Sequence, residues 1–84
     1  MLGSALVVLG FVACSNANIA HKKGDNAYAI GEYYTASKFY KTAYSRTPAK
    51  DKPKRAHRAF LMGECFRHVG YAQKAVAAYQ NAVR

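Results

Sequence analysis

The chain has 84 residues and a formal net charge of +9, from 13 Lys and Arg against four Asp and Glu. This length allows one small domain, near the size at which a single hydrophobic core becomes marginal. The basic charge raises the question of nucleic-acid binding, but no docking element with a defined set of base contacts is visible, so we expect no nucleic-acid partner.

The chain begins with an apolar segment. Residues 2–13 (LGSALVVLGFVA) carry no charge and have the length of a signal-peptide apolar region, which is short for a membrane-spanning helix. Cys14 follows directly, and then the polar residues SNAN. This order resembles the lipobox of bacterial lipoproteins. The resemblance implies that 1–13 is a signal peptide, that Cys14 carries lipid and that 14–18 is the tether; the alternative is a buried first helix with an inert cysteine.

The lipobox also bears on location. A single short acyl chain binds membranes only reversibly, but the several chains of a bacterial lipoprotein would anchor the protein firmly. No acidic run follows Cys14, and in related lipoproteins such runs direct export to the cell surface. We therefore expect a lipid-anchored protein of the outer membrane that faces the periplasm.

Two helices are predicted next, over residues 19–30 and 32–45. Asn16 or Asn18 can cap the first of them, whose apolar face is thin. The second has a regular apolar stripe at the i, i+3, i+4, i+7 and i+8 spacing of an amphipathic helix. This stripe comprises Ala36, Phe39, Tyr40, Ala43 and Tyr44.

Residues 47–55 form a basic connector with two prolines. Pro48 is expected to stop the preceding helix, Asp51 to cap the next one, and Pro53 to lie in its first turn. A basic cluster here could meet phosphate, anionic lipid headgroups or an acidic partner surface. The simpler interpretation, which we favour, is a solvated loop and helix start. The cluster comprises Lys50, Lys52, Lys54, Arg55 and Arg58.

A second pair of helices is predicted, one ending near Val69 and the other running from about Tyr71 to the last residue. Several residues of the first pair recur in the second after a constant step of 39 residues, which indicates two copies of one helix–turn–helix unit. The recurring pairs are Gly24 and Gly63, Gly31 and Gly70, Ala36 and Ala75, Tyr40 and Tyr79, and Ala43 and Ala82.

The unit resembles the tetratricopeptide repeat (TPR), in which W-x₂-L-G-x₂-Y, A-x₃-F and P are spread over about 34 residues. The first copy departs from this pattern at Lys23 and Ala27, and the five extra residues fit in the connector. The resemblance implies an all-α fold of two TPR-like repeats, 19–46 and an incomplete 56–84. The alternative is an ordinary helical hairpin with incidental similarity. The matching residues are Gly24, Ala36, Tyr40, Ala43 and Pro48 in copy one, and Met62, Gly63, Phe66, Ala75, Tyr79 and Ala82 in copy two.

The TPR pattern also assigns roles to side chains. Small residues would let paired helices approach closely, and aromatic residues would fill the space between layers. The repeat-packing set is Gly24, Ala36, Tyr40, Ala43, Gly63, Phe66, Ala75, Tyr79 and Ala82. The first helix of each unit normally lines a concave surface, and a mixed aromatic and basic groove suits an extended or acidic peptide of a partner; the alternative is plain solvent exposure. The partner-binding set is His21, Lys22, Asp25, Tyr28, Phe60, Glu64, Arg67 and His68, with Asn18 and Leu61 beside it.

The sequence gives no sign of an enzyme, a metal site or a cofactor. Cys65 and His68 are three residues apart, but no second Cys or His pair at zinc spacing completes a site. No Gly-x-Ser-x-Gly, no phosphate-binding Gly-rich loop and no paired carboxylates are present. We expect Cys65 to be a small packed residue.

Four phrases are more specific than a generic repeat: KGDxAY, GEYY, FYKxAYS and GECFR. With the lipobox, they resemble the start of PorE-type lipoproteins of the type 9 secretion system, also described as OmpA-family lipoproteins. That family continues with a β-propeller and an OmpA-like domain that binds peptidoglycan. The resemblance therefore implies peptidoglycan contact only through downstream domains that this sequence does not contain.

Two functions remain open at this stage. One is a lipid-anchored scaffold for protein partners in the cell envelope, and the other is a free-standing TPR module that recognises a peptide or adaptor. Because helical solenoids usually need about three repeats and a polar cap, we expect the chain to be the front of a longer protein. The alternative is that a second copy supplies the missing layer.

Overall fold

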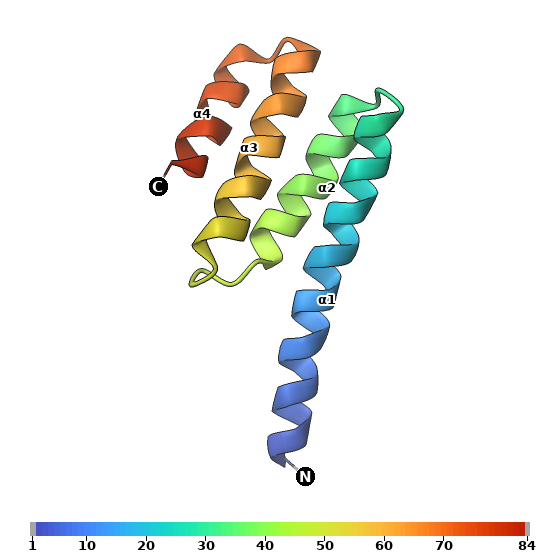
Figure 1. Cartoon of the computed structure of the whole chain (residues 1–84), viewed down its shortest axis with the longest axis vertical. Helices are drawn as coiled ribbons and strands as arrows, with labels where there is room; N and C mark the ends of the chain where they lie inside the picture. Colours follow the sequence, from blue (N-terminus) through green and yellow to red (C-terminus); the bar gives the residue numbers. More distant parts are fainter. Residues whose placement is uncertain (1, 84) are drawn as a thin grey trace.

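The fold is a row of helices arranged as two hairpins. The computed structural model describes the backbone of residues 2–83 and the side chains of residues 16–83. Within these residues the structure is all-α, and α1 packs on α2, α2 on α3 and α3 on α4 (Figure 1). The helices are α1 (Leu2–Ala29), α2 (Tyr33–Arg46), α3 (Lys52–Val69) and α4 (Ala72–Ala82).

Helix α1 is longer than the predicted helix over 19–30. It is continuous from Leu2, and its N-terminal half projects beyond the other helices (Figure 1). Residues 2–13 include three Leu and two Ala, which favour helix, beside three Val and two Gly, which favour it less, and no proline interrupts them. Asn16 and Asn18 therefore lie inside α1 rather than at its start. The signal-peptide prediction for 1–13 and the lipid prediction for Cys14 concern side chains outside the described residues.

The two hairpin turns have the same geometry. Gly31 and Gly70 take left-handed backbone conformations, with φ of 80° and 91°, which suit glycine because it has no Cβ. In each turn the next residue donates its backbone N–H to a carbonyl five residues back. These bonds run from Glu32 to Ala27 and from Tyr71 to Phe66, both at 2.9 Å. The turns thus keep the 39-residue step of the sequence.

The connector between the hairpins forms largely as predicted. Helix α2 ends at Arg46, and Asp51 caps α3 by accepting a 3.3 Å hydrogen bond from the backbone N–H of Lys54. Pro53 lies in the first turn of α3, as expected. Thr47, just after α2, is buried, and its hydroxyl donates a 2.6 Å hydrogen bond to the carbonyl of Ala43.

The core lies where α1 and α2 meet α3. Tyr40 is the largest fully buried side chain, and it packs with Ala27, Ala36 and Cys65. A Cβ added to Gly24 would meet the Tyr40 ring at 2.6 to 3.0 Å, so the glycine gives the ring its space. Gly63 faces Tyr79 in the same way, where an added Cβ would lie 2.5 Å from Cδ1. Both hairpins therefore use a glycine to admit a tyrosine from the partner helix.

Within the described part of the chain, no helix combines the length and the apolar character that crossing a bilayer requires.

Candidate functional site

The predicted partner-binding residues divide into groups according to the side chains that they contact. Tyr28 of α1 and His68 of α3 meet, because the Tyr28 hydroxyl lies 3.1 Å from Nε2 of His68. The ring of Tyr33, from the start of α2, stacks on His68 with centroids 4.1 Å apart and planes 9° apart. Tyr33 was not among the predicted residues. These three rings join the hairpins near their glycine turns.

Two residues of the predicted face, His21 and Asn18, are held by Arg58. This side chain was assigned to the solvated basic cluster, but that assignment is wrong, since Arg58 is only 4 % exposed. Its Nε donates to Nδ1 of His21 at 3.0 Å and its Nη2 to Oδ1 of Asn18 at 2.9 Å. Nη1 donates to the hydroxyl of Thr47. These acceptors compensate for the lost water, although burial still lowers the pKa of Arg58.

The hydrogen bond from Arg58 selects one tautomer of the neutral His21 ring. Because Nδ1 accepts the hydrogen bond from Arg58, the proton of the neutral ring is on Nε2, which lies 3.5 Å from Oδ1 of Asp25. Burial lowers the pKa of His21, and the nearby Arg58 adds to this effect, while Asp25 opposes it. The ring of His57 stacks alongside at 5.6 Å. His21 acts here as a link between α1 and α3 rather than as an open contact.

Three other predicted residues face α4. Glu64 accepts hydrogen bonds from Arg67 at 2.7 Å and from the Tyr79 hydroxyl at 3.0 Å. These bonds, the one from Arg67 first, lower the pKa of Glu64. The ring of Phe60 lies 5.9 Å from that of Tyr79. Glu64 and Arg67 also lie close enough to Tyr28 of α1 to influence its pKa, so these side chains contact α4 without leaving the neighbourhood of α1.

Exposure also varies among the predicted residues. In the partner-binding set, His21, Tyr28 and Glu64 are half-buried, whereas Lys22, Asp25, Phe60, Arg67 and His68 are exposed. In the repeat-packing set, Phe66, Tyr79 and Ala82 are half-buried, and the other six are buried: Gly24, Ala36, Tyr40, Ala43, Gly63 and Ala75. Sequence reasoning left out Ala59 and Ala78, which are 1 % and 3 % exposed.

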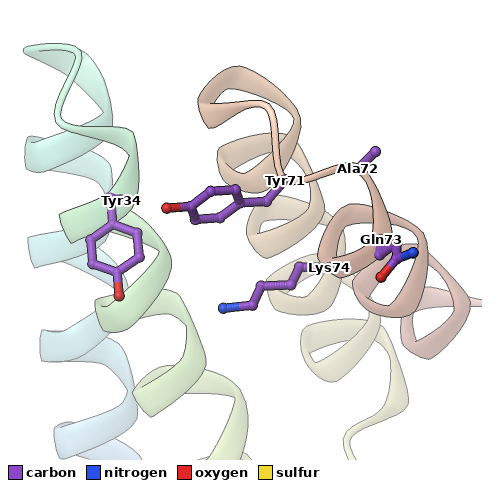
Figure 2. A pocket seen from close by; sticks show the side chains of 5 residues that line it. All are labelled: Tyr34, Tyr71, Ala72, Gln73 and Lys74. Carbon is purple, nitrogen blue, oxygen red and sulfur yellow. The ribbon is translucent and has the colours of Figure 1, made fainter.

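A pocket opens between α2 and the start of α4. Its volume is about 370 Å³, and in Figure 2 the ring of Tyr71 and the side chain of Lys74 extend toward Tyr34 across it. The two tyrosine rings meet edge to face, with centroids 6.3 Å apart. Both remain nearly half exposed, at 47 % and 45 %. The pocket is lined by Tyr34, Tyr71, Ala72, Gln73 and Lys74.

Lysines border both tyrosines of this pocket. Nζ of Lys38 lies 4.8 Å from the ring centroid of Tyr34, and Nζ of Lys74 lies 5.3 Å from that of Tyr71. None of the lining residues carries a carboxylate. Aromatic faces beside ammonium groups suit a ligand that has both an apolar and an anionic part. In the sequence, the only indication of this site is that Tyr34 and Tyr71 lie outside the apolar stripes.

The described residues show no arrangement typical of a metal or nucleophilic centre. No group of three or more His, Cys, Asp or Glu among them could hold a metal ion. Cys65 is fully buried, and burial raises the pKa of its thiol to about 11, so the reactive thiolate is scarce near neutral pH. Its place in the core agrees with the prediction of a packed residue.

Comparison of the chain with protein-family models, curated proteins and solved structures gives no match.

Proposed function

We propose that this protein is a lipid-anchored protein–protein interaction module of the bacterial cell envelope. In this proposal its hairpins are TPR-like repeats, Cys14 carries the lipid, and the module faces the periplasm from the outer membrane. It serves as a scaffold in a type 9 secretion or OmpA-family lipoprotein system. The lipobox-like start and the four specific sequence phrases motivate the envelope part of the proposal.

One observation supports the repeat part above the others. In the first hairpin Gly24 makes room for Tyr40, whose hydroxyl donates a 2.6 Å hydrogen bond to Asp25. In the second, Gly63 makes room for Tyr79, whose hydroxyl donates to Glu64 at 3.0 Å. Each carboxylate follows its glycine directly, so the same three-residue device occurs twice. Stacked helical units of this kind serve mainly as surfaces for other proteins.

The contact with a protein partner is placed at the pocket between α2 and α4. Tyr34 and Tyr71 offer large, exposed rings, and tyrosine is among the residues that dominate binding energy at interfaces. Lys38 and Lys74 favour an acidic segment, and the net charge of +9 acts in the same direction over a longer range. The partner segment would place an apolar side chain against the two tyrosine rings and carboxylates beside the lysines.

A cross-linking experiment tests this assignment. The tagged full-length chain, expressed in its own cells, should cross-link to an envelope protein, and the double variant Tyr34→Ala, Tyr71→Ala should lose most of that product. The matched control is Lys22→Ala with Phe60→Ala, on the face predicted from sequence. If the control loses the product and the tyrosine variant keeps it, partner binding belongs to that other face and the pocket assignment is wrong.

Lipid attachment is tested separately. In cells labelled with a fatty-acid analogue, Cys14→Ala should abolish labelling and leave an uncleaved, mislocalised precursor. Equal labelling and membrane recovery of the variant would contradict the anchor. Co-purification with envelope-spanning components supports the scaffold, whereas a tight complex with one short peptide alone supports the free-standing recognition module.

A further inference from the structure

Positive charge is concentrated at one end of the helical row. The connector between α2 and α3 forms this end together with the last residue of α2 and the first turn of α3, and the three segments present four exposed cations against one carboxylate, Asp51. The opposite end contains the two glycine turns, residues 30–32 and 69–71, and with the adjoining helix turns it presents Lys74, Arg67, which is paired with Glu64, and the carboxylate of Glu32. The cations of this basic end are Arg46, Lys50, Lys52 and Lys54.

These cations are free to meet a ligand, unlike the other arginines of the connector region. Arg55 is half-buried, with its guanidinium 4.3 Å from the ring centroid of Tyr44 and hydrogen-bonded to the carbonyl of Thr47. Arg58 is buried among three acceptors, as described above. Lys54 makes only a 4.0 Å contact with Asp51, and its side chain is 59 % exposed. The basic cluster of the sequence therefore divides into two structural arginines and three exposed lysines.

The basic end lies beside the part of α1 that follows Cys14. Arg46 lines a shared surface hollow with Asn16 and Ile19 of α1. Asn16 is two residues from Cys14, about 3 Å along a helix axis. In Figure 1 the connector and the projecting N-terminal half of α1 lie at the same end of the row. A lipid on Cys14 would thus bring this end, and not the glycine turns, to the bilayer.

We propose that the basic end, Arg46 with Lys50, Lys52 and Lys54, docks on an anionic phospholipid surface. Its orientation toward the bilayer rests on the lipid anchor of the proposed function, but the attraction does not, because it needs only exposed lysines and anionic headgroups. Each basic residue near such a surface is worth roughly a fivefold change in partition. Docking would orient the helices roughly along the membrane normal. The pocket between α2 and α4, near the glycine turns, would then lie away from the membrane.

Vesicle binding tests the proposal without any lipid on the protein. The full chain with Cys14→Ala is titrated with phosphatidylcholine vesicles and with vesicles that also contain phosphatidylglycerol. The apolar residues 2–13 are expected to give a baseline of binding to both kinds of vesicle. The proposal concerns only the additional binding that phosphatidylglycerol causes. Replacing Lys50, Lys52 and Lys54 by Gln should reduce this increase by roughly a hundredfold at low salt, and high salt should weaken it in the parent chain.

The matched control replaces Lys22, Lys38 and Lys41 by Gln, which removes the same charge from exposed positions on α1 and α2 outside the hollow that Arg46 lines. It should keep most of the increase, and circular dichroism should show both variants to be folded. Equal losses in the two variants, or no increase in the parent chain, would overturn the proposal. The proposal would also be overturned if the variant of the three connector-region lysines kept its vesicle binding but lost an acidic protein partner, because the lysines would then belong to a protein-binding surface. Failure of Cys14 labelling would overturn the anchor and leave this result unaffected.

Discussion

The hydroxyl of Tyr40, on α2, donates a 2.6 Å hydrogen bond to Oδ1 of Asp25, on α1. Tyr40 is only 1 % exposed, whereas the Asp25 side chain is 54 % exposed, so the bond leads from the core to the surface. Burial and the Asp25 carboxylate both raise the pKa of Tyr40, burial being the larger cause. The phenol is therefore a permanent donor at physiological pH.

Truncating this tyrosine should be costly. Tyr40→Ala removes a fully buried ring and leaves a cavity, so the free energy of unfolding should fall by roughly 3–5 kcal/mol. Lys50→Ala, in the exposed connector, should change it by no more than about 0.5 kcal/mol. Urea titration followed by circular dichroism measures both. Similar effects of the two substitutions would mean that α1 and α2 do not pack through Tyr40.

Gly24 should not tolerate a methyl group. Gly24→Ala improves helix propensity by up to about 1 kcal/mol, but the new Cβ would lie 2.6 Å from the Tyr40 ring, which has no free space to move into. Overpacking typically costs about 1–3 kcal/mol, so we expect a net loss of stability in the same urea titration. Gly63→Ala should cost less, because Tyr79 is only half-buried. A net gain from Gly24→Ala would contradict the packing.

Thr47 should matter through Arg58. Thr47→Val keeps the shape of the side chain but removes the acceptor for Nη1 of the buried guanidinium, together with the donor to the carbonyl of Ala43. A buried donor without a partner costs about 1–3 kcal/mol, and we expect a loss of stability in that range. The control is Thr35→Val, since Thr35 is exposed on α2 and should change stability by less than about 0.5 kcal/mol. Equal effects would show that Thr47 and Arg58 are not coupled.

Stability should fall when His21 is forced to take up a proton. Its pKa is lowered in the folded chain, mainly by burial, so below pH of about 6.5 the unfolded chain binds more protons than the folded one. The free energy of unfolding should therefore decrease as the pH falls from about 6.5 through the folded pKa, and His21 should contribute no pH dependence above that window. Protonation would also place a hydrogen on Nδ1, opposite the Nε–H donor of Arg58, so the hydrogen bond between the two side chains would be lost.

Urea midpoints at neutral and mildly acidic pH measure this effect. His21→Gln should lose much of the acid-induced drop, whereas His57→Gln, which removes the neighbouring ring, should keep most of it. An NMR titration of the His21 ring provides a direct check. A His21 pKa at or above about 6.5 would contradict the expected sign.

The fold was largely predictable, because local signals and packing agree in most of the chain. The apolar stripe that includes Ala36, Tyr40 and Ala43 became the buried face of α2, and glycines ended the helices where a left-handed turn was needed. Asp51 became a cap as its position before Pro53 indicated. The start of α1 differs from the preferred prediction, since Asn16 and Asn18 looked like caps, whereas a first helix over the preceding residues was only the alternative.

The interaction surfaces were less predictable, because contacts between hairpins are not visible in the periodicity of either one. Arg58 looked like one member of a basic run, and only its distances to Asn18 and His21 show that it is structural. Conversely, Tyr34 and Tyr71 are 37 residues apart and belong to no shared register, so nothing in the sequence brought them together. Their pairing depends on how α4 lies against α2 and α3.

Because the thiol of Cys65 is fully buried, its rate of alkylation reports how often the helices around it separate. The chain contains no tryptophan to report on its core, but in a Cys14→Ala background Cys65 is the one thiol left. An alkylating reagent can reach it only when α3 separates from Tyr40 and Ala36, so the alkylation rate measures how often that separation occurs. A bound partner that holds the hairpins together should lower the alkylation rate of Cys65, and acid that breaks the His21 hydrogen bond to Arg58 should raise it.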